Sequence, residues 1–132
     1  MNDIIEDVVT GIQHIGIPTG NMEATAAFFA ALGFRETYRT VIKDKNQLVR
    51  FFSLKNVVIE AYTVPEPTAR SGAIDHFTLN VTDIERAYEL VRNAGFTSIE
   101  GEICCLPFFD SGVRYFTVEG PDKEKVEFNQ KL

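Results

Sequence analysis

"HFTLNVTDIERAYELVRNAGF", residues 76–96, decides the fold, because the chain contains a second version of it. "HIGIPTGNMEATAAFFAALGF", residues 14–34, aligns with it without a gap, from a histidine to a Gly-Phe pair. His14 and His76 are the only two histidines in the 132 residues. An internal repeat of this length predicts two copies of one structural unit.

Each unit is predicted to begin with a short strand that leads into a helix. Asp83 is the expected N-cap of the second helix and Gly95 its end, and Asn21 and Gly33 have the same places in the first. An apolar stripe at helical spacing lies between these ends. It comprises Met22, Thr25, Ala26, Phe29 and Leu32 in the first helix, and Ile84, Ala87, Tyr88, Val91 and Ala94 in the second.

Three further strands follow in each unit. They are predicted at 35–42, 48–54 and 57–63, and at 97–104, 112–118 and 124–130. Residues 64–73, with two prolines and a glycine, form the expected linker. The sequence therefore predicts an α+β fold: a single domain, 1–132, of two tandem βαβββ modules at 11–63 and 74–130.

Composition and charge exclude several classes of function. The formal net charge is −6 and no block of five basic residues occurs, which argues against nucleic acid and anionic membranes as partners. No apolar run approaches the roughly 20 residues of a membrane span, and the acidic N-terminal stretch is too short in its apolar part for a signal peptide. We therefore expect a cytoplasmic protein. The adjacent Cys104 and Cys105 are expected to be a reduced pair, with a redox or metal role as the alternative.

Strand alternation places the histidines on one face of the predicted sheet. Phe77, Leu79 and Val81 share the face that must cover the helix, so His76 points to the opposite, open side. The same parity applies to His14. In the last strand of each module, Glu60 and Glu127 are repeat mates, and they too face the open side.

These four polar residues are informative only as a set. A single strand histidine is usually hydrogen-bonded, and a single strand glutamate is usually solvated. Four polar groups in otherwise apolar strands are costly unless they are paired or coordinated, and imidazole with carboxylate suits a first-row divalent ion. We therefore predict a metal site. Its ligands would be His14, Glu60, His76 and Glu127.

Four motifs, "HIGI", "VIEAY", "DHFTLNV" and "GPDKEKVEF", give the chain a family resemblance over residues 11–130. It resembles the vicinal oxygen chelate superfamily, also called the glyoxalase/bleomycin-resistance/extradiol-dioxygenase fold. The resemblance implies a curved mixed sheet with a metal-binding groove, and ligands from the first and fourth strand of each module. The His/Glu/His/Glu set is most similar to that of bacterial glyoxalase I (lactoylglutathione lyase), whereas epimerases of the superfamily typically have glutamine at the position of Glu60.

The resemblance also implies an activity. A divalent ion (Ni, Zn, Co or Mn) would hold vicinal oxygens of a small-molecule substrate, such as a thiol–methylglyoxal hemithioacetal. Glu127 or Glu60 would move a proton, and Glu127 is preferred because Asn129 follows on its face. A homodimer is expected, with each site within one chain or across two. The alternatives are another enzyme of the superfamily, such as an epimerase or thiol transferase, or a metal-free small-molecule binding or resistance protein.

Some positions depart from the family pattern or stay open. "GPDKEK" replaces the usual Asp-Pro-Asp-Gly turn, and no basic side chains can be matched to those that bind glutathione. The repeat mates Arg50 and Arg114 could be structural or could serve the pocket. Phe108 and Phe109 could form a pocket wall or pack in the core.

Overall fold

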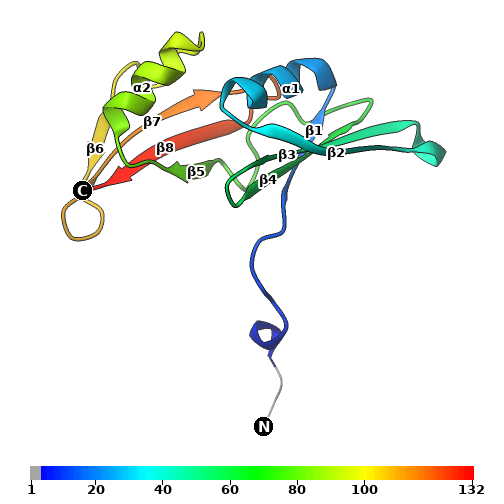
Figure 1. Cartoon of the computed structure of the whole chain (residues 1–132), viewed down its shortest axis with the longest axis horizontal. Helices are drawn as coiled ribbons and strands as arrows, with labels where there is room; N and C mark the ends of the chain where they lie inside the picture. The colour runs from blue at the N-terminus through cyan, green and yellow to red at the C-terminus, as the bar shows by residue number, and fades with distance from the viewer. Residues whose placement is uncertain (1–3) are drawn as a thin grey trace.

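The computed structural model describes residues 4–132 and contains the two expected modules (Figure 1). Module one comprises β1 (Ile15–Thr19), α1 (Met22–Ala31), β2 (Arg35–Ile42), β3 (Gln47–Leu54) and β4 (Val57–Thr63). Module two comprises β5 (Phe77–Asn80), α2 (Ile84–Asn93), β6 (Cys104–Leu106), β7 (Val113–Glu119) and β8 (Lys125–Lys131). Short 3-10 turns span Ile5–Asp7 and Lys43–Lys45. The predicted α+β class and tandem βαβββ order are confirmed.

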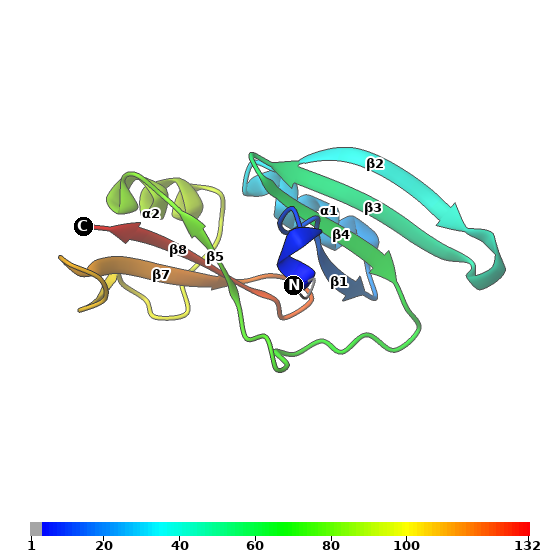
Figure 2. The ribbon, with the colours of Figure 1, turned by 90° about the horizontal axis from the view of Figure 1, so that it is seen from below.

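Each module has its own four-stranded mixed sheet. The strand orders are β1-β4-β3-β2 and β5-β8-β7-β6, in which the first strand of a module runs parallel to its fourth and the other pairs are antiparallel. Figure 2 shows the two sheets side by side. Both helices cover the same side of the sheets, which leaves the opposite faces open (Figure 1). No helix within residues 4–132 is long and apolar enough to cross a membrane.

The helix boundaries follow the predicted capping signals. The side chain of Asn21 accepts a hydrogen bond from the backbone N–H of Ala24, and that of Asp83 accepts one from Arg86. Gly33 and Gly95 follow the helix ends with φ values of +98° and +99°, in the region that glycine adopts without strain. The repeat in sequence is therefore a repeat in local structure.

The strand predicted at 97–104 is wrong in extent, because residues 97–103 form a loop and β6 is only three residues long. The backbone N–H of Gly101 turns back to the hydroxyl of Ser98, and Gly101 has a φ of +78°. Glu100 then accepts a hydrogen bond from the backbone N–H of Thr117 at 2.7 Å through its carboxylate. A side chain thus takes the place of a strand carbonyl beside β7.

The first helix is buried against both modules. Phe29 packs against Phe52 of its own sheet, whereas Phe28 packs against Phe96 of module two, with ring centroids 5.3 Å apart. Thr25 donates a hydrogen bond to the carboxylate of Asp122 at 2.6 Å. The predicted stripe of α1 omitted Phe28, which is buried and whose partner Phe96 lies in module two.

Candidate metal centre

The four predicted ligands form two equivalent pairs, one in each module. His14 and His76 lie one residue before β1 and β5, and parallel pairing brings each to the glutamate of the fourth strand. His14 Nε2 lies 3.5 Å from Glu60 Oε1, and His76 Nε2 lies 3.1 Å from Glu127 Oε1. The side chains of Glu60 and Glu127 are 27% and 15% exposed, so neither is fully buried.

A single chain does not bring the two pairs together. Among the described residues, 4–132, no three or more His, Cys, Asp or Glu side chains are grouped so that they could hold a metal ion. The His14–Glu60 pair and the His76–Glu127 pair each therefore supply half of the predicted ligand set.

Each histidine is oriented by the residue that precedes it. His76 Nδ1 lies 3.0 Å from a carboxylate oxygen of Asp75, and His14 Nδ1 lies 2.9 Å from the side-chain oxygen of Gln13. Hydrogen bonds from His76 and then Lys125 hold the pKa of Asp75 below its ordinary value. Because Asp75 and Gln13 offer oxygen acceptors there, we assign the ring proton of each histidine to Nδ1.

This tautomer leaves both Nε2 lone pairs facing carboxylate oxygens. Two acceptors at such a distance repel unless a cation, either a proton or a metal ion, lies between them. An Nδ1–H held by a carboxylate or an amide oxygen is also the usual outer partner of a metal-bound histidine. The donor set and its support therefore fit a divalent ion. The sequence analysis missed Gln13 and Asp75, although they are repeat mates and the alignment could have identified them.

The two glutamates differ in their surroundings. Asn129 Nδ2 donates to Glu127 Oε2 at 2.8 Å, which holds that carboxylate in one orientation. Glu60 lies beside Gly16, where an added Cβ would stand 3.7 Å from Glu60 Oε1 and 3.4 Å from the ring of Tyr62. The module-two residue paired with Glu127 is Thr78. The strand that neighbours the glutamate therefore presents no side chain beside it in module one, and presents a threonine beside it in module two.

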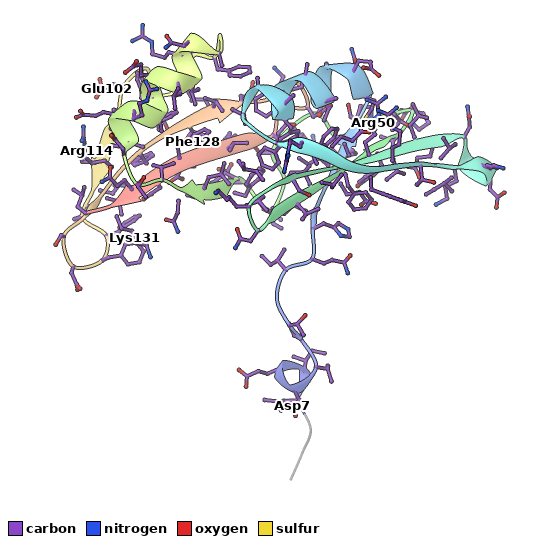
Figure 3. The ribbon with its side chains drawn as sticks, viewed as in Figure 1. Asp7, Arg50, Glu102, Arg114, Phe128 and Lys131 are labelled. Carbon is purple, nitrogen blue, oxygen red and sulfur yellow. The ribbon has the colours of Figure 1, made fainter. Side chains whose placement is uncertain are left out.

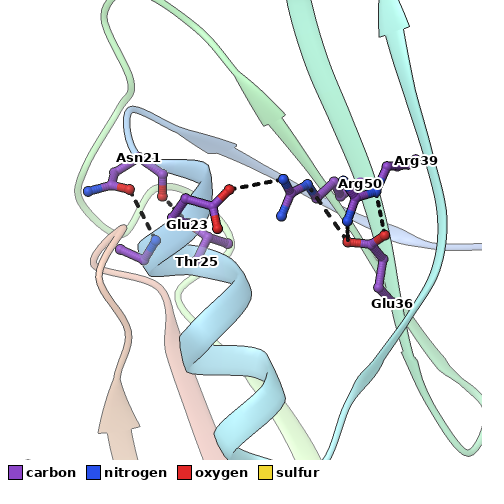
Figure 4. Close-up of polar contacts among 7 residues, drawn as sticks. Asn21, Glu23, Thr25, Glu36, Arg39 and Arg50 are labelled. Atoms are coloured by element: carbon purple, nitrogen blue, oxygen red, sulfur yellow. Dashed lines mark hydrogen bonds and ion pairs between the residues drawn. The ribbon is translucent and has the colours of Figure 1, made fainter.

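The two repeat-mate arginines link strands to helices. Arg50 donates to Glu23 of α1 at 2.9 Å and lies 3.7 Å from Glu36 (Figure 4). Arg114 donates to Glu85 of α2 at 3.2 Å. Both positions therefore have a structural role on the helix side, away from the metal-ligand pairs.

The loop before β7 and the cysteine pair lie outside the core. Phe108 and Phe109 are 51% and 69% exposed, so the alternative of core packing is wrong for them. Lys131 Nζ lies 4.3 Å from the ring centroid of Phe109. Cys104 and Cys105 are free thiols, and burial, followed by the charges of nearby carboxylates, raises the pKa of Cys104. A raised pKa disfavours the reactive thiolate.

A family model covers most of the chain. The family model described as Glyoxalase/Bleomycin resistance protein/Dioxygenase superfamily matches residues 11–128. The chain belongs to this superfamily. Uncharacterized protein YwbC of Bacillus subtilis (strain 168) is 28% identical over 127 residues, which cover 91% of this chain and 97% of YwbC.

Solved structures of the superfamily share the fold. A glyoxalase family protein from Enterococcus faecalis superposes with a TM-score of 0.78 at 21% identity, covering 91% of this chain and 97% of that one. The fosfomycin resistance protein FosX from Listeria monocytogenes, in complex with Mn(II) and sulfate, superposes with a TM-score of 0.69 at 16% identity over 95% of each chain. Mn(II) is thus a ligand of one protein that shares this fold.

Proposed function

We propose that two copies of this chain form a homodimer with two metal sites, each shared between the copies. In each site, His14 and Glu60 of one subunit would meet His76 and Glu127 of the partner subunit. The observation that carries this proposal is the matched pair of His–Glu contacts, 3.5 Å and 3.1 Å long, which one chain keeps apart. Closed two-fold symmetry would complete both sites at once, because each subunit offers both halves.

We propose a glyoxalase-like lyase or isomerase reaction on a small substrate with vicinal oxygens, such as a thiol–methylglyoxal hemithioacetal. A bound divalent ion supplies Lewis-acid polarisation of those oxygens. The protein's own part is proton transfer: a carboxylate removes a proton from one carbon and returns it to the neighbouring carbon. We assign this role to Glu127, because Asn129 orients its carboxylate, and we assign Glu60 mainly to ligation.

Metal titration and turnover together test the proposal. The wild-type protein, His14→Ala, His76→Ala and the control Glu66→Gln, an exposed linker residue, would be stripped with a chelator and titrated with Ni(II), Co(II), Zn(II) and Mn(II). We expect one tight site per chain in the wild type and the control, and a large loss of affinity in both histidine variants. Each loaded protein is then assayed with the glutathione–methylglyoxal hemithioacetal.

The outcomes separate the possible functions. Metal uptake with turnover supports the proposed reaction. Tight metal binding without turnover of this hemithioacetal contradicts the proposed reaction, and fits another enzyme of the superfamily or another thiol adduct. The absence of tight metal binding in the wild type would contradict the metal site itself and fit a small-molecule binding protein.

A further inference from the structure

Residues 4–12 form an arm that leaves the molecule on the open side of the sheets (Figures 1 and 3). Its aliphatic side chains are each more than half exposed: Ile4, Ile5, Val8, Val9 and Ile12. The spacing of these five residues is that of one face of an amphipathic helix, although only Ile5–Asp7 forms a 3-10 turn. Exposed apolar side chains clustered in this way are typical of a segment that packs against a partner.

A groove begins where the arm joins the molecule. It has a volume of about 1030 Å³ and lies between the β3–β4 turn of module one and β5 of module two. Thr10, Gly11 and Ile12 form part of its rim, and most of the remaining surface is apolar. The apolar lining residues are Ile15, Leu54, Val57, Val58, Phe77, Leu79, Val81 and Phe128.

The charges of the arm and the groove are complementary. The arm carries Glu6 and Asp7, and the sequence contains no lysine or arginine before Arg35. Among the described residues, the groove is lined by Lys55 and by no acidic side chain. Asp7 lies far from both sheets (Figure 3), so its charge can meet Lys55 only after the arm has docked.

We propose that the arm of each subunit packs into this groove of the partner subunit. The inference rests on the homodimer of the proposed function, in which His14, next to the arm, meets His76 of the partner subunit, next to the strand that lines the groove. Residues 10–12 already occupy the rim of their own groove, and the chain then runs away from it. Exchange of two identical arms satisfies two-fold symmetry and covers both stripes.

Disulfide trapping tests where the arm docks. In a background of Cys104→Ser and Cys105→Ser, Val9→Cys chains are mixed with Asn80→Cys chains, because Asn80 is an exposed residue that lines the groove. We expect a covalent heterodimer of the two chains on mild oxidation. A matched mixture of Val9→Cys with Val41→Cys, an exposed position on the β2–β3 hairpin, should give none. Cross-linking only within a chain that carries both Val9→Cys and Asn80→Cys would overturn the exchange.

Dimer dissociation gives an independent readout. Val8→Asp with Val9→Asp should raise the dimer dissociation constant by at least about tenfold in sedimentation experiments, since two apolar anchors are lost. The control Val41→Asp should leave it unchanged. An unchanged constant in the arm variant of a dimer that still binds metal would overturn the arm exchange alone. A wild-type chain that stays monomeric at all concentrations would overturn both the arm exchange and the shared metal site.

Discussion

Module one and module two repeat the same ligand geometry but differ in what surrounds it. Both place a histidine just before the first strand and a glutamate in the fourth. Outside those strands they diverge: β2 has eight residues, all exposed, whereas β6 has three. α1 buries four residues and α2 two. The two modules are therefore alike in the strands that carry the proposed ligands. They differ in the outermost strand of each sheet and in how many residues each helix buries.

The largest expected effect on activity comes from replacing each of the two glutamates with glutamine in turn. At saturating metal, Glu127→Gln should lower turnover by about 10²–10⁴-fold, or on the order of 3 to 5 kcal/mol of barrier, because an amide cannot accept the proton. Glu60→Gln should act mainly on metal affinity. Measuring kcat and metal Kd for both variants sharpens the comparison between modules. Near-full activity in both would contradict proton transfer by these carboxylates.

Glu124 should make the stability of the protein depend on pH, and module one has no equivalent group at this position. Burial, and then the charge of Asp122, raises the pKa of Glu124 to about 7, and its Oε2 atom is buried without a hydrogen-bond partner among the described residues. A carboxyl pKa above its unfolded value means that stability is full at low pH and falls as pH rises through about 7. The repeat mate in module one is Val57, which cannot ionise.

Glu124→Gln should therefore remove a pH-dependent loss of stability. The variant should be more stable than the wild type at pH 8 by up to about 3 kcal/mol and similar to it near pH 4, since 1 pKa unit is worth about 1.4 kcal/mol. Urea unfolding from pH 4 to pH 9 measures this, with the exposed Glu66→Gln as the control. Equal slopes of stability against pH in wild type and variant would contradict the assignment to Glu124.

The contact between Thr25 and Asp122 exists on one side of the repeat only. Thr25 is fully buried, and its repeat mate is Ala87. Thr25→Val should destabilise the protein by about 1 to 3 kcal/mol, because the carboxylate of Asp122 loses a buried donor. Thr37→Val is the control, since that hydroxyl bonds to Ser53 on the exposed hairpin. If Thr25→Val lowers the free energy of unfolding no more than Thr37→Val does, this contact does not stabilise the packing of the modules.

The smallest effect compares the two arginines. Arg50 has two carboxylate partners and a side chain that is 16% exposed, whereas Arg114 has one partner and is 32% exposed. Arg50→Gln should lower the free energy of unfolding by about 1 kcal/mol, and Arg114→Gln should lower it by about 0.5 kcal/mol or less. Both losses should be smaller at high salt, because salt screens ion pairs. Thermal unfolding at two salt concentrations measures the difference. A larger cost for Arg114 would reverse the comparison.

Local signals in the sequence predicted most of the fold and the pairing of each histidine with a glutamate of the same module. The caps Asn21 and Asp83 act within three residues, and strand parity fixes the face of Glu60 and Glu127 once the strands are known. What the sequence could not show depends on distant contacts. Thr25 and Asp122, which are joined by a hydrogen bond between the modules, are 97 positions apart in the sequence. The loop at 97–103 was mistaken for a strand because it bonds to β7 through only one backbone N–H, that of Ile99, and through the carboxylate of Glu100, and not through a regular ladder.

Mixing two variants that each lack one histidine tests the shared metal site most directly. In a heterodimer of a His14→Ala chain with a His76→Ala chain, purified by different affinity tags, one shared site would lack both histidines and the other would be complete. We predict one tight Mn(II) or Co(II) site per heterodimer by calorimetric titration, and none in either variant homodimer. A heterodimer that binds metal no better than the two homodimers would contradict a site built from two chains.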